Sequence, residues 1–199
     1  FKLKFIKCNF AKDSIKYLGH IIGFNTVQPL SDNLVAINEF PVPKTRKNVR
    51  QLLGKIFYNK FIPFSSTLLE PHYYILQKDV PFLWSNQCQR SFESVKSLLT
   101  SEPILSVFDR NKPIVIYADA NAVGIGAVLK QPQDDGVEKP VTYFSRKLNE
   151  SQRKKKAIYI ETLAIHEAVQ FWRFWLIGKK FTIITDHKPL EGLNLKARP

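Results

Sequence analysis

The stretch of residues 113–129 constrains the fold more than any other part of the chain, and it reads PIVIYADANAVGIGAVL. Its first apolar run is typical of a buried strand, and the apolar run after it is typical of a neighbouring strand. Asp119 ends the first run. A carboxylate at the edge of an apolar core is costly unless a cation, a metal or hydrogen bonds compensate it. The rest of the chain is therefore expected to supply a partner for Asp119.

Two further acidic residues stand in positions of the same kind. Glu161 lies in a predicted helix, at helical spacing from the apolar Ala168 and Trp172, so it shares the inward stripe. Asp186 directly follows the apolar run FTIIT. If the first and last strands of this region are neighbours and the helix packs on them, Asp119, Glu161 and Asp186 converge at one end of a sheet. Each acid taken singly has a structural alternative: a turn cap, an ion pair with a lysine, or a helix cap.

Converging carboxylates repel one another unless divalent cations neutralise them. Oxygen ligands of this kind suit Mg²⁺ or Mn²⁺ rather than zinc. Two such ions about 3.5–4 Å apart support in-line attack on a phosphodiester. Asp119, Glu161 and Asp186 are thus predicted to be catalytic metal ligands of a nuclease.

Composition narrows the class of partner. Lysine and arginine total 30 against 17 acidic residues, a net charge of +13 that favours nucleic acid. No run of about 20 apolar residues is present, so we expect no membrane span. The two cysteines, Cys8 and Cys88, are too few for a disulfide framework or a zinc site. The chain contains no methionine, so we expect an internal piece of a longer translation product.

The periodicity predicts a mixed α/β chain in three parts. Residues 1–29 carry two β-like runs, 5–9 and 15–22, that predict a hairpin. Residues 30–103 predict a small helical module, whose expected helices are a short one over 33–40 capped by Ser31-Asp32, one from about 45, one over 65–77 and one after the Ser85 cap. Residues 104–199 predict a βββαβ domain, with strands at 114–118, 124–129, 141–144 and 181–185 and one long helix over 151–176.

Three groups of residues are candidates for nucleic-acid contact. The helix from about 45 has a basic outer surface, and its candidates for backbone contacts are Lys44, Arg46, Lys47, Arg50, Lys55 and Lys60. Gly124 and Gly126 let a backbone or a ligand come close, which fits a nucleic-acid strand crossing the sheet, and a bulge or simple packing is the alternative. The aromatic residues Phe171, Trp172, Phe174 and Trp175 have a spacing that favours core packing over base stacking.

On these motifs the chain resembles the ribonuclease H domain of reverse transcriptases from gypsy-type long-terminal-repeat retrotransposons. The matching segments are YADANAVGIGAVL, PVTYFSRKL, the helix segment ETLAI and TDHKPL. Upstream, KCNFAKDSIKYLGHIIG resembles the end of a polymerase palm with its primer-holding hairpin, VRQLLGKIFYNKFIPFSS resembles thumb-type helices, and FLWSNQCQRSFESVKSLLTSEPIL resembles the segment leading into ribonuclease H. The resemblance covers almost the whole chain.

The resemblance implies a fragment of an RNA-directed DNA polymerase whose ribonuclease H degrades the RNA strand of RNA–DNA hybrids with Mg²⁺. Asp119, Glu161 and Asp186 match the first three metal-binding carboxylates of the family. Two departures stand out: no Tyr-x-Asp-Asp polymerase motif occurs in the chain, and the fourth carboxylate of the family falls past Pro199. Lys155 also stands where the family often has a tyrosine. The implied partners are RNA–DNA hybrid, template-primer and the rest of the Pol polyprotein, in a cytoplasmic replication particle or the nucleus.

The main alternative is a non-catalytic module, a decayed or co-opted copy that keeps the fold and the basic surface and binds nucleic acid without turnover. An actin-like ATPase with the same strand order is disfavoured because no phosphate-binding glycine loop is present.

Overall fold

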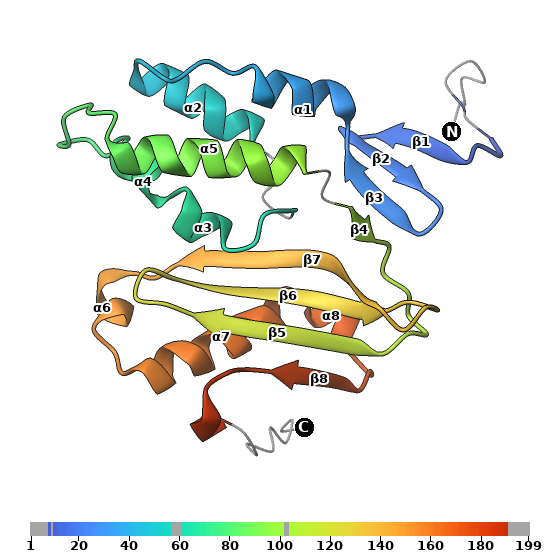
Figure 1. Cartoon of the computed structure of the whole chain (residues 1–199). Helices are drawn as coiled ribbons and strands as arrows, with labels where there is room; N and C mark the ends of the chain where they lie inside the picture. Colours follow the sequence, from blue (N-terminus) through green and yellow to red (C-terminus); the bar gives the residue numbers. More distant parts are fainter. Residues whose placement is uncertain (1–7, 9, 57–60, 102–103, 191–199) are drawn as a thin grey trace, which may run out of the picture.

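The computed structural model describes residues 8, 10–56, 61–101 and 104–190, and it stacks a small sheet and a helical module on a larger sheet (Figure 1). The small sheet has the order β1-β2-β3-β4 and is antiparallel throughout. Its strands are β1 (Ser14–Tyr17), β2 (His20–Gly23), β3 (Thr26–Pro29) and β4 (Leu105–Ser106). The last strand comes from far along the chain, so a strand pairing joins residues on both sides of the helical module.

The predicted strand over 15–22 was wrong, because it is two strands. Leu18 and Gly19 take positive φ angles of 45° and 79° and form the turn between β1 and β2. A glycine adopts such angles without steric cost, which makes this the natural place to reverse the chain. The other expected run, 5–9, lies outside the described residues except for residue 8.

The helical module contains five helices in the described part of the chain. They are α1 (Ser31–Asn38), α2 (Arg46–Lys55), α3 (Ser65–Leu68), α4 (Glu70–Tyr74) and α5 (Asn86–Thr100). The expected Ser85 cap of α5 is present, since its hydroxyl accepts the Cys88 N–H. The Thr45 hydroxyl, which was not predicted as a cap, accepts the Asn48 N–H at the start of α2. The predicted cap of the first helix was wrong: Leu30 is the N-cap of α1, and no side chain caps it.

The single helix expected over 65–77 was also wrong, because α3 and α4 are separate. Pro71 lies at the start of α4, where its missing N–H is harmless, whereas it would interrupt the hydrogen bonds of one continuous helix. Leu52 of α2 and Ile56, which directly follows α2, pack with Phe92 and Leu99 of α5 in one buried cluster.

The larger sheet confirms the predicted mixed α/β class. Its order is β7-β6-β5-β8, with β5 parallel to β8 and the other pairs antiparallel. The strands are β5 (Ile114–Ala120), β6 (Gly124–Pro132), β7 (Glu138–Lys147) and β8 (Phe181–Ile184), followed by the 3₁₀ helix η3 (Lys188–Leu190). Apolar side chains on one face of this sheet, among them Ile116, Ile125 and Leu129, form a core with the helices that follow β7.

The long helix expected over 151–176 was wrong, because this region is three helices. They are α6 (Glu150–Arg153), α7 (Ala157–Phe171) and α8 (Arg173–Leu176). Asn149 and Gln152 close a capping box around α6, and Lys156 is extended, so α7 begins afresh after the basic run. At Trp172 the backbone leaves helical geometry while the indole stays in the core.

The helical module docks on the face of the larger sheet opposite α7 (Figure 1). Phe64 takes a left-handed φ of 49° and lays its ring over Gly126, where a Cβ would come within 2.5 Å of ring carbons. Nearby, the Ser66 N–H donates to the Ser145 hydroxyl at 3.1 Å. Lys147 forms an ion pair with Glu70 at 2.8 Å. Polar and close apolar contacts together therefore hold the module in register with β6 and β7.

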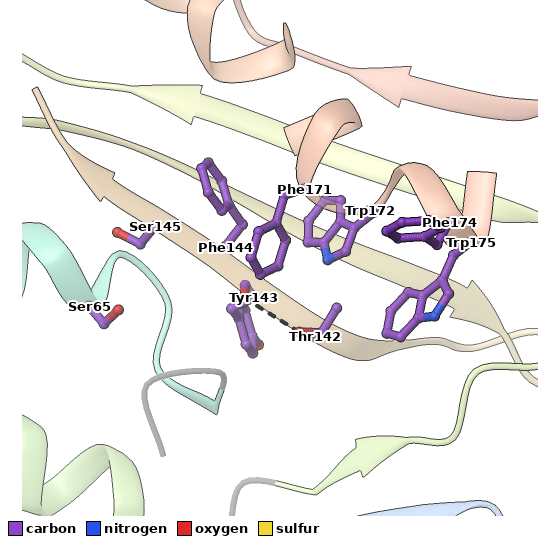
Figure 2. Close-up of a pocket in the computed structure, with 9 residues that line it drawn as sticks. All are labelled: Ser65, Thr142, Tyr143, Phe144, Ser145, Phe171, Trp172, Phe174 and Trp175. Carbon is purple, nitrogen blue, oxygen red and sulfur yellow. Dashed lines mark hydrogen bonds between the residues drawn. The ribbon is translucent and has the colours of Figure 1, made fainter. Parts of the chain in front are cut away.

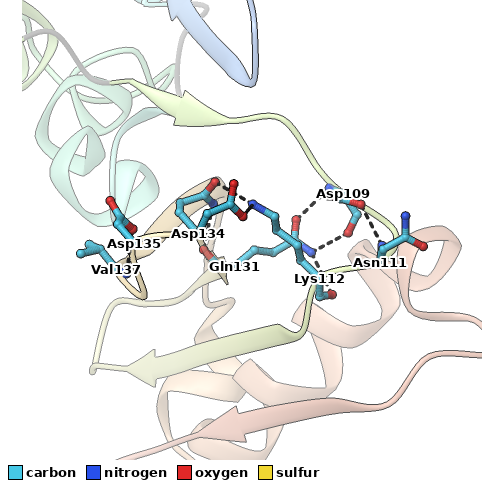
Figure 3. A network of polar contacts seen from close by, with 8 residues as sticks. Asp109, Asn111, Lys112, Gln131, Asp134, Asp135 and Val137 are labelled. Atoms are coloured by element: carbon cyan, nitrogen blue, oxygen red, sulfur yellow. Dashed lines mark hydrogen bonds and ion pairs between the residues drawn. The ribbon is translucent and has the colours of Figure 1, made fainter.

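A polar network ties the segment before β5 to the end of β6 (Figure 3). The side-chain amide of Gln131 is buried and accepts the Asp109 N–H at 2.9 Å while donating to the Asp109 carbonyl at 2.8 Å. Lys112 completes the network with an ion pair to Asp134 at 3.1 Å. Buried polar groups satisfied in this way specify one arrangement of the backbone. The network therefore helps to set the register of the strand that carries Asp119.

Cys88 is a free thiol that is buried in the helical module. Within the described ranges, no helix combines the length and the apolar character that crossing a bilayer requires.

Candidate active site

Three acidic side chains meet at one end of the larger sheet. Asp119 is the next-to-last residue of β5, and Asp186 lies two residues past β8. Because β5 and β8 are parallel neighbours, with Tyr117 opposite Ile184, both carboxylates emerge at the same edge. Glu161 arrives from the second turn of α7, and the three groups offer oxygen atoms that all lie within 4.8 Å of one another. The convergence predicted from the strand order is therefore present.

The burial of the three acids differs from the sequence interpretation. Asp119 lies within β5 rather than after it, and it is exposed, as is Asp186. Glu161 is the half-buried member, and its Oε2 is buried without a hydrogen-bond partner among the described residues. Burial of a negative charge is therefore unfavourable mainly for Glu161, because Asp119 and Asp186 remain exposed to solvent.

The pKa of Glu161 is raised to about 7. Burial is the largest cause, and the negative charges of Asp119 and Asp186 add to it, while a backbone hydrogen bond at Ala120 acts in the opposite direction. A raised pKa for a glutamate beside two other carboxylates indicates that no positive charge within the described residues compensates the cluster.

The backbone around the aspartates is shaped by short local hydrogen bonds. Asn121 Oδ1 accepts the N–H groups of Val123 and Gly124, each at 2.9 Å, and so closes the turn that follows Asp119. On the other strand, Thr185 Oγ1 accepts the His187 N–H at 3.2 Å. Asn121 was not predicted as part of this site, although an asparagine shortly after the end of an apolar run is a turn signal.

These residues fit one or more divalent cations. The donors are carboxylate oxygens only, which suit Mg²⁺ or Mn²⁺, and the partnerless Oε2 of Glu161 gains a partner when a cation binds. Asp119 and Asp186 would hold such a cation from the solvent side, and Glu161 from the core side.

A cavity of about 350 Å³ adjoins two of the carboxylates. Asp119 and Asp186 lie on its wall, and most of the remaining wall is apolar, with Phe64, Tyr117 and Ile184 contributing. Phe64 comes from the helical module, so the docking of that module shapes the space beside the acidic cluster.

The residues predicted to contact nucleic acid lie in different environments. Lys44, Lys47, Arg50 and Lys55 are exposed at or on α2, which lies on the side of the helical module away from the larger sheet (Figure 1). They are therefore not brought to the carboxylates. Arg46 is half-buried, and its guanidinium donates to the carbonyl of Val80. Lys60 lies outside the described residues.

Gly124 and Gly126 do allow a close approach, as predicted. The group that approaches them is the helical module, whereas we expected a strand of nucleic acid. A Cβ at Gly124 would lie 2.9 Å from the Thr67 hydroxyl, and one at Gly126 would meet the ring of Phe64. Both glycines are buried under the helical module. Packing, the alternative interpretation, is what the structure contains at these two positions.

The aromatic residues at the end of α7 were also interpreted wrongly in large part. Only Trp172 is in the core, with 3% of its surface exposed. Phe171, Phe174 and Trp175 are exposed to 59%, 73% and 38%, because the break at Trp172 turns α8 away from the helical stripe.

Comparison with known proteins agrees with this fold. A family model described as "RNase H-like domain found in reverse transcriptase" matches residues 84–183. The Transposon Tf2-3 polyprotein of Schizosaccharomyces pombe is 36% identical over 189 residues, which is 94% of this chain and 14% of that polyprotein. The chain thus spans about one seventh of the length of such relatives.

Solved structures share the fold at low sequence identity. A foamy viral protease-reverse transcriptase in complex with dsDNA has a TM-score of 0.75 and 19% identity, covering 94% of this chain and 40% of that one. The same viral protein in complex with RNA/DNA hybrid has a TM-score of 0.72 and 19% identity, covering 87% of this chain and 24% of that one. The predicted resemblance is confirmed: the chain belongs to the reverse transcriptase and ribonuclease H region of gypsy-type retrotransposon polyproteins.

Proposed function

We propose that this part of the polyprotein hydrolyses the RNA strand of RNA–DNA hybrids by two-metal catalysis. One observation carries the proposal: Asp119, Glu161 and Asp186 present oxygen atoms within 4.8 Å of one another in a ribonuclease H-like domain. Divalent cations bound there would activate water and stabilise the leaving oxygen of the phosphodiester.

The residues of the chain have separate tasks in this proposal. Asp119 and Asp186 are exposed, so they face the side from which a phosphodiester approaches. Glu161 is held from behind by α7, and the backbone hydrogen bond at Ala120 orients its carboxylate. Because its pKa is about 7, Glu161 is only partly ionised near neutral pH, and positive charge at the site would favour its ionisation.

The substrate class follows from charge and from the family. A net charge of +13 favours a polyanion, and the exposed Lys44, Lys47, Arg50 and Lys55 supply candidate phosphate contacts beside the template-primer. The foamy viral reverse transcriptase of the same fold is described in complexes with dsDNA and with RNA/DNA hybrid. We extend this class of partner to the present chain, with the rest of the polyprotein supplying DNA polymerisation from an RNA template.

The test is cleavage of a labelled RNA strand in an RNA–DNA hybrid, with Mg²⁺, with Mn²⁺ and with chelator. We expect metal-dependent cleavage that falls by more than about 100-fold in Asp119→Asn, because a ligand matters at least as much as the groups that orient it. Asp134→Asn is the matched control, since this exposed aspartate pairs with Lys112 away from the site.

Hybrid binding is measured in parallel by fluorescence anisotropy. Binding without metal-dependent cleavage would contradict the proposal and support the alternative of a non-catalytic binding module. Cleavage that Asp119→Asn leaves intact would show that the acidic cluster is not the reaction centre.

A further inference from the structure

The exposed aromatic residues at the end of α7 surround a cavity of about 480 Å³ (Figure 2). The cavity lies beside β7, and Figure 2 shows Trp172 between Phe171 on one side and Phe174 with Trp175 on the other. Its lining residues are Ser65, Thr142, Tyr143, Phe144, Ser145, Phe171, Trp172, Phe174 and Trp175. Large aromatic faces left open to solvent in one place are typical of a binding site.

A polar group in the wall of this cavity lacks a partner. Trp172 is 97% buried, and its Nε1–H has no acceptor among the described residues. A buried donor without an acceptor destabilises the folded chain, so such groups are rare unless a ligand or water completes them. The cavity therefore combines stacking surfaces with a donor that is available for a ligand acceptor.

Charge around the cavity identifies the class of ligand. None of the nine described residues that line it is acidic. The guanidinium of Arg173 lies over the Phe174 ring at 4.6 Å, and the exposed Lys179 and Lys180 come three and four residues after the end of α8. A ligand that matches these features is flat, accepts a hydrogen bond and carries negative charge on an attached group.

We propose that this cavity binds a base of single-stranded nucleic acid. The base stacks on Phe171 or Phe174 and accepts the Trp172 Nε1–H, while Arg173 contacts the adjoining phosphate. Aromatic platforms beside cationic side chains bind single strands in this way. Cation–π contact with Arg173 already presents the Phe174 ring in a fixed orientation.

The site is separate from the carboxylates and goes beyond hydrolysis. Trp172 directly follows α7 and lies 11 positions after Glu161, about 16 Å along a helix axis. The two sites also differ in chemistry, because one gathers acidic oxygens and the other aromatic faces with a single donor. A strand held at this cavity would be single-stranded, whereas the proposed substrate at the carboxylates is a duplex.

The test uses a short oligouridine and an abasic oligonucleotide of the same length and charge, titrated into the full chain at raised salt, with anisotropy as the readout. Raised salt suppresses phosphate contacts elsewhere on this basic protein. We expect oligouridine to bind more tightly than the abasic strand, and Phe171→Ala and Phe174→Ala each to weaken it about 10-fold. Trp172→Phe, which keeps a ring and removes the donor, should weaken it several-fold.

The controls separate binding from folding. Tyr74→Ala removes an exposed aromatic residue that does not line the cavity and should leave binding unchanged. Thermal unfolding of each variant shows whether the fold is retained. Equal binding of oligouridine by wild type and the folded Phe171→Ala and Phe174→Ala variants would overturn the proposal, as would equal affinity for the abasic strand. Either result would favour a protein partner as the ligand of the exposed aromatic side chains Phe171, Phe174 and Trp175.

Discussion

Replacing Glu161 by glutamine should stabilise the protein in the absence of divalent metal. Glutamine keeps the shape of the side chain and removes the charge that burial and two neighbouring carboxylates oppose. The same change removes a candidate metal ligand, so it should also abolish any stabilisation by Mg²⁺. A gain in stability that accompanies a loss of function is the expected behaviour of a strained functional site.

The size and the sign of the effect follow from the pKa. In the unfolded chain the carboxyl ionises near its ordinary value of 4.5, and in the folded chain near 7. This group's contribution to stability is therefore complete below pH 4.5 and is lost as the pH rises through about 7. At about 1.4 kcal/mol per pKa unit, the upper bound is about 3 kcal/mol. Because the side chain is only half-buried, solvent screening reduces this to roughly 1–2 kcal/mol.

The assay is urea denaturation followed by tryptophan fluorescence, at pH 5 and pH 8, with chelator and with Mg²⁺. With chelator we expect Glu161→Gln to exceed wild type by roughly 1–2 kcal/mol at pH 8, and by much less at pH 5. Glu167→Gln is the matched control on the same helix. It breaks an ion pair with Arg146 at 3.0 Å, so it should lower stability slightly at both pH values.

A destabilised Glu161→Gln at pH 8 with chelator would refute the reasoning, since it would mean that the ionised carboxylate is already compensated within the chain. Equal stabilisation of wild type and Glu161→Gln by Mg²⁺ would show that the cation binds elsewhere.

Three other perturbations have defined outcomes. Gly126→Ala should cost about 1–3 kcal/mol in urea denaturation, because its Cβ would overlap the Phe64 ring, and the loss should shrink in a Phe64→Ala background. Burial lowers the pKa of His72 to about 4, so stability should fall by up to about 3 kcal/mol as the pH drops from 6.5 to about 4, and His72→Phe should lack this component. Lys47→Ala and Arg50→Ala should each reduce by about one the slope of log affinity against log salt for hybrid binding.

Each of these has its own control or contrary result. Gly54→Ala, where a Cβ meets nothing within 4 Å, should not lower stability, and a loss equal to that of Gly126→Ala would contradict the packing argument. An unchanged acid profile in His72→Phe would show that another group causes the loss. Lys96 donates to the carbonyls of Asn38 and Phe40 at 2.7 Å each, so Lys96→Ala should lower stability and leave the salt slope intact.

Much of the fold could be predicted because local pattern and tertiary structure agree there. The helix α5 begins at the expected cap, Ser85, since an oxygen that accepts a free N–H acts within one turn of the chain. The four strands of the larger sheet were found from their apolar runs, although β5, β6 and β7 extend further than the runs indicated, whereas β3 and β4 of the small sheet were not predicted. Glu161 could be placed on an inward stripe because helical periodicity is a local property as well.

Contacts between distant segments decided the rest. Nothing near Gly126 in the sequence indicates that the Phe64 ring covers it, because the two residues meet only when the helical module docks on the sheet. The helix breaks at 154–156 and at Trp172 contain no proline or glycine, so the sequence pattern continues through them. In the structure Lys156 is extended, and the Trp172 indole is buried where the backbone leaves helical geometry.

The acidic site shows both contributions together. The order of strands and acids along the chain was enough to predict that Asp119, Glu161 and Asp186 converge, because parallel neighbouring strands end at one edge. Which acid is buried was not predictable, since burial depends on how α7 lies against β5 and β6. The exposure of Phe171, Phe174 and Trp175 was not predictable for the same reason. It depends on the break between α7 and α8, which turns these side chains toward solvent.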